Sequence, residues 1–253
     1  MPLTVHQFPC LSDNYGFLAR DEATGLAACV DTPEAGAILR ELDRLGWKLA
    51  LILNTHWHPD HAGGNAEIKA ATGCTIVGPK EVTRISELDR EVVGGDTVKL
   101  GETSFQVIET GGHTLGHITY FDSADRIAFV GDTLFALGCG RLFEGTAEQM
   151  WTSLQRLAAL PDDTTVYCAH EYTASNARFA LSVDDDPALK ARADQVFAAR
   201  ERGEPTVPTT IGLEKATNPF LRAPALAGRV GAAGEPDYKA FGAVRAAKDV
   251  FKG

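Results

Sequence analysis

Four side chains of metal-ligating type fall within six consecutive residues, in the segment Thr55-His56-Trp57-His58-Pro59-Asp60-His61. Three imidazoles and a carboxylate suit a transition metal, because imidazole binds zinc and its neighbours and a carboxylate adds an anionic oxygen ligand. The chain has seven histidines in all, so three of them within six residues fit an ordinary polar loop poorly. Pro59 and the later Gly63-Gly64 turn the backbone, so these side chains need not share one direction, which indicates two neighbouring metal sites.

Three further side chains of ligand type come later in the chain, each after an apolar run and next to a glycine or a turn. They are His113, Asp132 and His170. Taken alone, a histidine after a strand is more often an ordinary core or loop residue, and Gly-Asp is usually a turn. Together with the first four they exceed what one metal needs, and Asp132 is the natural carboxylate to bridge two ions.

The elements that must hold these residues are short apolar strands interrupted by helices. We expect strands at residues 4–8, 15–19, 27–30, 48–53, 75–77, 105–108, 118–121, 127–130 and 165–168. We expect helices at 33–45, 66–71 and 146–160, and beyond residue 172 at 174–181, 187–202 and 240–251. Many strands with few helices predict an α+β or α/β protein in which packed sheets are covered by helices.

Two acidic positions allow more than one interpretation. Asp31 precedes Thr32-Pro33 and is favoured as a helix N-cap with proline at the first helical position. It could also accept the second N–H of a ligating imidazole, and the two roles could coexist. The acidic run 184–186 before Pro187 is favoured as a helix cap over a metal site.

The order His-x-His-x-Asp-His, then His113, Asp132 and His170, resembles the metallo-β-lactamase superfamily. Later motifs resemble its glyoxalase II family, the hydroxyacylglutathione hydrolases, and the resemblance extends from end to end of the chain. These motifs are Gly138-Cys139-Gly140-Arg141-Leu142-Phe143-Glu144-Gly145-Thr146, Ala169-His170-Glu171-Tyr172-Thr173, Asn218-Pro219-Phe220-Leu221-Arg222 and Ala243-Val244-Arg245-Ala246-Ala247-Lys248-Asp249. The metal motif is specific for the superfamily but does not indicate the substrate. The later motifs indicate the substrate.

The resemblance implies a four-layer αββα sandwich over residues 1–172 and a small helical, glutathione-binding domain over 173–253. It also implies two divalent metal ions, with zinc expected and iron or manganese accommodated. The first ion would be held by His56, His58 and His113, the second by Asp60, His61 and His170, and Asp132 would bridge both.

The implied reaction is hydrolysis of the thioester S-(2-hydroxyacyl)glutathione, chiefly S-D-lactoylglutathione, to D-lactate and glutathione in methylglyoxal detoxification. A hydroxide shared by the two metals would attack the carbonyl carbon, and Asp60 could orient it. A thiolate, from a thiol of pKa about 8.5, can leave without a dedicated general acid.

The resemblance also implies which side chains bind the glutathione moiety. Arg141, Arg245 and Lys248 would hold it, with Tyr172 donating from its hydroxyl. Phe143 stands where some family members carry tyrosine, so any hydrogen bond from that hydroxyl is absent. A solvated basic end of a helix is the alternative interpretation of Arg245 and Lys248.

Other reactions remain open on the same scaffold: a glutathione-persulfide dioxygenase with one iron, a lactonase or a β-lactamase. The complete set of seven ligands disfavours a mononuclear oxygenase, and the helical C-terminal region with its basic residues disfavours a β-lactamase. A non-catalytic metal-binding protein is a further alternative, which a missing ligand would favour, and none is missing.

Composition and net charge limit the classes of partner and the cellular location that we expect. The 253 residues carry a formal charge of −10, which argues against nucleic acid and anionic membranes as partners and requires that cations for an anionic substrate be gathered locally. We expect no signal peptide and no membrane span, because no apolar run approaches about 20 residues. Five scattered cysteines predict free thiols and a reducing cytoplasm. We expect a monomer.

Overall fold

The computed structural model describes residues 3–253, and its internal contacts divide the chain into two compact units. The first is formed by residues up to Glu109 and by Gly116–Gly131. The second is formed by Thr110–Leu115 and Asp132–Gly253. This division reflects packing between elements, and the domain boundary expected near residue 172 stays a prediction.

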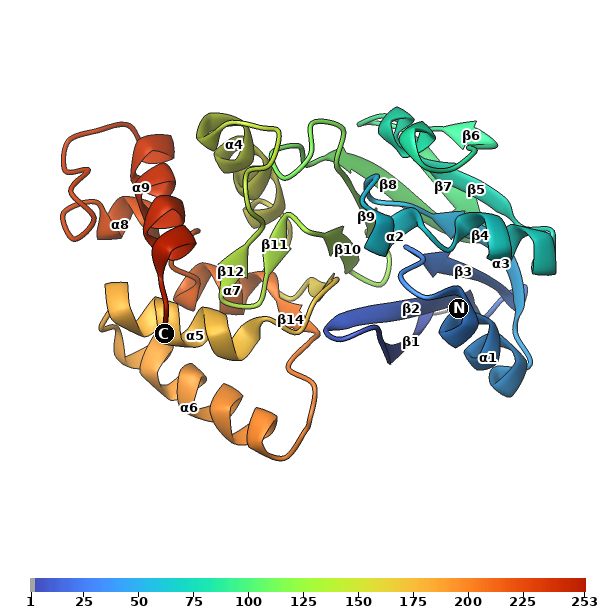
Figure 1. Cartoon of the computed structure of the whole chain (residues 1–253), viewed down its shortest axis with the longest axis horizontal. Coiled ribbons are helices and arrows are strands. Elements are labelled where there is room, and N and C mark those ends of the chain that lie inside the picture. Colours follow the sequence, from blue (N-terminus) through green and yellow to red (C-terminus); the bar gives the residue numbers. More distant parts are fainter. Residues whose placement is uncertain (1–2) are drawn as a thin grey trace. The chain divides into compact units, whose positions relative to one another are not determined.

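The first unit contains a six-stranded sheet whose strands lie side by side in chain order (Figure 1). The strands are β1 (Leu3–Cys10), β2 (Asn14–Asp21), β3 (Leu26–Val30), β4 (Lys48–Leu53), β5 (Thr75–Gly78) and β6 (Arg90–Glu91). The first three pair antiparallel, and β3 to β6 pair parallel. Parallel neighbours need a crossover, which α1 (Ala35–Leu45) and α3 (Asn65–Thr72) supply on the way into β4 and β5.

Helices α1 and α3 cover one face of this sheet. Ile38 and Leu42 of α1 and Ile68 of α3 are buried in one apolar cluster with strand residues such as Leu18 and Ile52. Helix α1 starts at Ala35, and its N-cap residue is Glu34. The predicted N-cap at Asp31 is therefore wrong, and the carboxylate of that residue is used elsewhere, as described below.

Four antiparallel strands of the first unit pack on the other face. They are β7 (Thr97–Leu100), β8 (Thr103–Glu109), β9 (Ile118–Asp122) and β10 (Ile127–Gly131). The ring of Phe129 lies 5.9 Å from that of Phe17 in the first sheet, and the Tyr120 hydroxyl donates to the carbonyl of Asn54 over 3.0 Å. The first unit thus has three layers, one of helices and two of strands.

The second unit is mainly helical. Helices α5 and α6 lie side by side in Figure 1 and share a buried contact through Ala177, Leu189 and Val196. Trp151 of α4 meets Phe241 of α9 with ring centroids 6.0 Å apart. The elements are β11 (Leu134–Phe135), β12 (Gly138–Cys139), α4 (Ala147–Ala158), β13 (Thr165–Cys168), α5 (Thr173–Val183), α6 (Pro187–Glu201), β14 (Thr209–Thr210), α7 (Ile211–Thr217), α8 (Ala223–Leu226) and α9 (Asp237–Val250).

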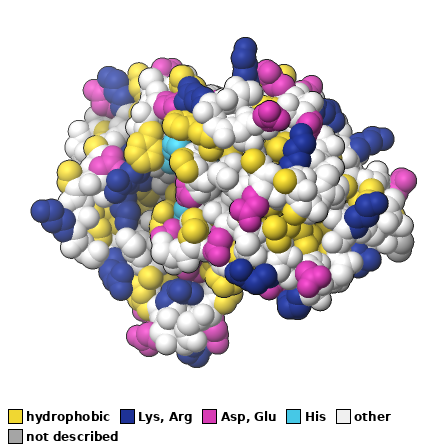
Figure 2. Space-filling model, turned by 45° about the vertical axis from the view of Figure 1, so that its right-hand side comes forward, with side chains coloured by type: hydrophobic (Ala, Val, Ile, Leu, Met, Phe, Trp, Pro, Cys, Tyr) yellow, Lys and Arg dark blue, Asp and Glu magenta, His cyan; other side chains and the backbone are white. Residues whose placement is uncertain are grey.

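The surface carries mixed charge. On the face drawn in Figure 2, basic and acidic side chains are interspersed. Within residues 3–253, no helix is both long enough and apolar enough to cross a membrane.

Candidate metal centre

The loop after β4 and the short helix α2 (Pro59–Ala62) carry four of the seven expected ligands. His56 Nε2 and His58 Nδ1 approach to 3.1 Å, and the two rings stand nearly perpendicular. On α2, His61 Nε2 lies 3.5 Å from a carboxylate oxygen of Asp60. The expected ligand atoms thus lie close together in two pairs, His56 with His58 before Pro59 and Asp60 with His61 after it.

A buried carboxylate orients two of these imidazoles. Asp31 Oδ2 lies 2.9 Å from His61 Nδ1 and accepts a hydrogen bond of 2.8 Å from the Thr55 hydroxyl. The other oxygen of Asp31 accepts from the Thr55 backbone N–H over 2.8 Å. Because the Thr55 hydroxyl proton points to Asp31, its oxygen accepts from His56 Nδ1, 3.0 Å away. In their neutral forms, His56 and His61 therefore present Nε2 lone pairs.

In the second unit, two imidazoles face the carboxylate of Asp132 through Nε2. One carboxylate oxygen lies 3.3 Å from His113 Nε2, and the other lies 3.4 Å from His170 Nε2. His113 Nδ1 donates to the backbone carbonyl of Arg141 over 2.9 Å, so its Nε2 also carries a lone pair. A carboxylate that offers one oxygen beside each of two imidazoles has the form required of a bridging ligand.

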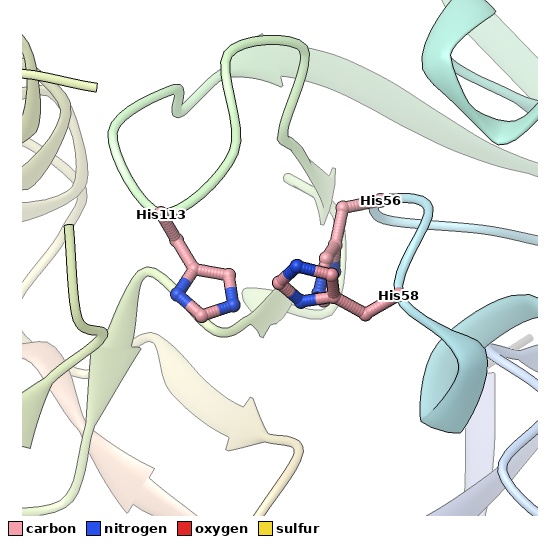
Figure 3. A group of neighbouring side chains, drawn as sticks. All are labelled: His56, His58 and His113. Carbon is pink, nitrogen blue, oxygen red and sulfur yellow. The ribbon is translucent and has the colours of Figure 1, made fainter. Parts of the chain in front are cut away.

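Figure 3 shows His56, His58 and His113 as neighbouring side chains. Their candidate ligand nitrogens lie within 4.8 Å of one another, and the same holds for the ligand atoms of Asp60, His61 and His170. These groups have the same members as the two trios expected from the sequence, and their role as metal ligands stays a prediction.

These donor sets fit divalent metal ions. Imidazole nitrogens and carboxylate oxygens are the ligands that zinc and its neighbours take in proteins. In addition, His56, His61 and His113 each have Nδ1 bonded to an oxygen, which fixes the ring and makes Nε2 the nitrogen with the lone pair. A cluster of structural histidines would not need this shared orientation.

All five residues expected to bind substrate line one cavity of about 430 Å³ in the second unit, together with His113 and Asp132. They are Arg141, Phe143, Tyr172, Arg245 and Lys248. Phe143 and Tyr172 are 61% and 38% exposed. Phe143 meets the His113 ring edge-on at 5.2 Å, and Tyr172 stacks on His170 at 4.6 Å.

The cations of this cavity differ in accessibility. Lys248 Nζ donates to the backbone carbonyl and hydroxyl of Ser175 over 3.0 and 3.1 Å. Burial, followed by the nearby charge of Arg245 and Arg141, lowers the pKa of Lys248 to about 8. Arg245 is only 5% exposed, and its guanidinium donates to the Cys139 carbonyl and the Asp249 carboxylate. Lys248 is therefore the more accessible of the two residues on α9.

Cys139 also lines the cavity, but its thiol is poorly suited to nucleophilic attack. Burial raises the pKa of Cys139 to about 11, and neighbouring Arg245 offsets only part of that effect. At neutral pH the thiol is protonated, and the thiolate is the nucleophilic form. All five cysteines are buried and free.

Sequence reasoning missed several residues that hold the ligands. Thr55 links Asp31 to His56, and Asn14 Nδ2 donates to Asp60 Oδ2 over 3.1 Å. Ser175 holds Lys248 from the adjacent helix. None belongs to a recognisable pattern of spacing, because each bonds a partner that is 24 to 73 positions away in the sequence.

Comparison with known proteins identifies similar chains. The model of the metallo-beta-lactamase superfamily matches residues 24–170, and that of the hydroxyacylglutathione hydrolase C-terminus matches residues 171–251. The hydroxyacylglutathione hydrolase of Maricaulis maris (strain MCS10) is 55% identical and covers 98% of this chain and 99% of that protein. The hydroxyacylglutathione hydrolase of Erythrobacter litoralis (strain HTCC2594) is 53% identical, with 98% and 100% covered.

Among solved structures, ETHE1 from Myxococcus xanthus is similar to this chain with a TM-score of 0.67. It is 29% identical in sequence, and the match covers 98% of this chain and 97% of that one. The similarity therefore includes both compact units.

Proposed function

The chain belongs to the metallo-beta-lactamase superfamily and, within it, to the hydroxyacylglutathione hydrolases, and we propose that it is a thioesterase that cleaves S-(2-hydroxyacyl)glutathione. The principal substrate would be S-D-lactoylglutathione, hydrolysed to D-lactate and glutathione in methylglyoxal detoxification. The observation that carries this proposal is one cavity that joins His113 and Asp132 to the cations Arg141 and Lys248. Reacting groups and anion-binding groups are thereby available to one ligand.

The proposed metal ligands fall into two trios and a bridge. His56, His58 and His113 would hold one ion, Asp60, His61 and His170 the other, and Asp132 both. We favour zinc, which takes imidazole and carboxylate ligands, although iron and manganese also fit this set. When bound, two such ions supply Lewis acidity and lower the pKa of a coordinated water toward about 7.

The side chains of the protein contribute orientation. Asn14 donates to Oδ2 of Asp60 and so helps to fix the carboxylate that we propose accepts a hydrogen bond from the attacking water. We propose that Asp60 in this way directs the water at the thioester carbonyl carbon. Asp31 and Thr55 act one step further out, by holding the rings of His56 and His61.

The leaving group needs little help. A free thiol has a pKa of about 8.5, so the thiolate can depart near neutral pH without a general acid. Glutathione carries carboxylates, and Arg141 and Lys248 would neutralise one of them within the cavity, with Tyr172 donating from its hydroxyl. These cations are needed locally because the chain as a whole carries a charge of −10.

The direct test is hydrolysis of S-D-lactoylglutathione by purified protein of known metal content, with the D-lactoyl thioester of a thiol lacking the glycyl carboxylate as control. We expect efficient turnover of the glutathione thioester and poor turnover of the control. Absence of turnover with two metals bound would overturn the proposal and direct the search to persulfides and lactones. Equal turnover of both thioesters would overturn the role of the cations.

Two further expectations accompany this proposal. Five free, buried thiols support a cytoplasmic location, because a reducing compartment keeps thiols free. We also propose a monomer, which light scattering after gel filtration would test, and a dimer mass would contradict it.

A further inference from the structure

Strands β11 and β12 and the turn between them, residues 134–139, are held by side chains of α5, α7 and α9 and by Asn218; we call this segment the pocket hairpin. Asn218 Nδ2 donates to the carbonyls of Phe135 and Gly138 over 3.1 and 2.9 Å. The backbone N–H of Leu137 donates to Glu214 Oε2 over 2.9 Å. The carbonyls of Ala136 and Cys139 accept from Asn176 and Arg245.

These anchoring side chains are buried and are themselves constrained. Glu214 and Asn218 are fully buried, and Asn218 Nδ2 also donates to Glu214 Oε2 over 2.9 Å. Arg192 and the Thr209 hydroxyl bind the other oxygen of Glu214, which gives its charge a partner. Buried polar groups are costly without partners, so removing one member of this network would leave its neighbours buried and unpaired.

The pocket hairpin would not keep its shape alone. Its ladder consists of two residue pairs, and such a short hairpin is at best marginally stable in water. Leu137 is buried with a φ of 57°, in the left-handed region that a leucine rarely adopts. A Cβ at Gly138 would lie 2.3 Å from Asn176 Nδ2, so the amide occupies the space that a side chain would need. The helices therefore determine the backbone path.

The pocket hairpin is also a wall of the cavity. Phe135 and Cys139 line it, and the two residues that follow, Gly140 and Arg141, line it as well. The ring of Phe135 meets Tyr172 edge-on at 5.4 Å. A shift of this turn would therefore move both an apolar wall and a cation of the cavity.

We propose that Glu214 and Asn218 are positioning residues for the glutathione thioester, which they do not touch. They act by holding the pocket hairpin in the conformation that fits the substrate. The proposal rests on the proposed thioesterase function and extends it, because it gives α7 and the residue after it a role in substrate affinity.

The test compares Asn218→Ala with Thr217→Ala. Thr217 is the matched control. It is buried, precedes Asn218 in the sequence and accepts a hydrogen bond from Arg192 in the same network, but no hydrogen bond joins it to the described residues of the pocket hairpin. We expect both variants to lower Tm. Only Asn218→Ala should raise KM for S-D-lactoylglutathione, by about tenfold, while kcat changes by less than about threefold and metal content is unchanged.

Amide hydrogen exchange supplies a readout that is independent of turnover. Exchange in the segment 134–141 should accelerate in Asn218→Ala and stay at the wild-type rate in Thr217→Ala. If Asn218→Ala does not fold, Glu214→Gln, which keeps the side-chain shape, takes its place with the same expectation. Equal KM values and equal exchange rates in the two variants would overturn the proposal. Wild-type protein that fails to hydrolyse the thioester would instead overturn the proposed function, and exchange would still decide whether these side chains hold the hairpin.

Discussion

Asp31 Oδ2 lies 2.9 Å from Nδ1 of His61, on the side of the imidazole away from the nitrogen that a metal would take. The same carboxylate reaches His56 through Thr55. One residue thus orients a proposed ligand of each metal.

Asp31→Asn is therefore expected to weaken both metal sites. Loss of such an outer partner typically costs about 10- to 100-fold in metal affinity. Competition between a chelator and protein loaded with zinc, read as metal retained per chain, measures the effect. Asp43→Asn is the control, because Asp43 is an exposed residue on α1. A variant that retains zinc as tightly as the wild type would contradict the prediction.

Asp60→Asn should abolish most activity even in the fraction of protein that keeps its metals. The amide retains the shape but cannot accept the water's hydrogen bond in the same way, and such groups contribute about 10²- to 10⁴-fold to rate. The measurement is kcat per metal-loaded chain, with loading determined on the same sample. Full activity in the loaded fraction would refute the role of Asp60.

Substrate affinity should fall as the pH rises through about 8. The pKa of Lys248 is lowered to about 8 by burial and by Arg245, Arg141 and Arg178, so the cation is lost above that pH. KM measured from pH 7 to 9.5 should rise, and Lys248→Met should remove this dependence. A pH-independent KM in the wild type would contradict the assignment.

The same lowered pKa has a consequence for stability. Below pH 8 the folded protein carries Lys248 charged in an unfavourable place. Between pH 8 and its ordinary value of 10.5 the unfolded chain binds more protons at this residue than the folded one, so this contribution stabilises the fold as pH rises. Urea unfolding should therefore show a smaller gain between pH 8 and 10 in Lys248→Met than in the wild type.

Substitution of Arg245 should change the free energy of unfolding more than substitution of Lys248, although both residues lie on α9. Arg245 is buried, donates to the Cys139 carbonyl and Asp249, and lies over the Phe220 ring at 4.9 Å. Arg245→Met should raise KM and also lower the free energy of unfolding by about 1.5–3 kcal/mol for the lost charged hydrogen bonds. Lys248→Met should raise KM with little loss of stability. Equal destabilisation in the two variants would contradict this distinction.

Phe143→Tyr should lower KM without destabilising the protein. The ring is 61% exposed, so a hydroxyl can be added in contact with solvent, and such surface changes usually stay within about 0.5 kcal/mol. If the hydroxyl reaches the glutathione moiety, one neutral hydrogen bond is expected to improve KM by about two- to tenfold. An unchanged KM would place the substrate away from this side of the cavity.

The proposed ligands could be found from the sequence because each follows an apolar strand. The sequence also allows Asp31 to accept the second N–H of a ligating imidazole, as it does from His61. It does not say which ring, because Asp31 and His61 are 30 positions apart and meet only when β3 and β4 pair in parallel. The start of α1 was misplaced for a related reason. Thr32-Pro33 has the composition of a helix start, but the Asp31 carboxylate is used by Thr55 and His61 instead.

The longer strands and helices were predicted with small shifts at their ends, because periodicity needs several residues to be visible. The short elements were not foreseen, among them β11, β12 and α7. A two-residue strand has no period to detect. Glu214 and Asn218 bond to residues about 80 positions earlier, so their importance for the cavity emerges only from the fold.

The hydrogen bonds that hold the pocket hairpin also have a consequence for the synthesis of the protein. The carbonyl of Cys139 is matched by a guanidinium 106 positions later in the chain. A growing polypeptide on the ribosome can complete β4 and β10, which precede His56 and Asp132, well before Arg245 has been translated. The proposed metal ligands are thus expected to be translated ahead of the residues that complete the substrate cavity, and the thioester can bind only once α9 has been synthesised.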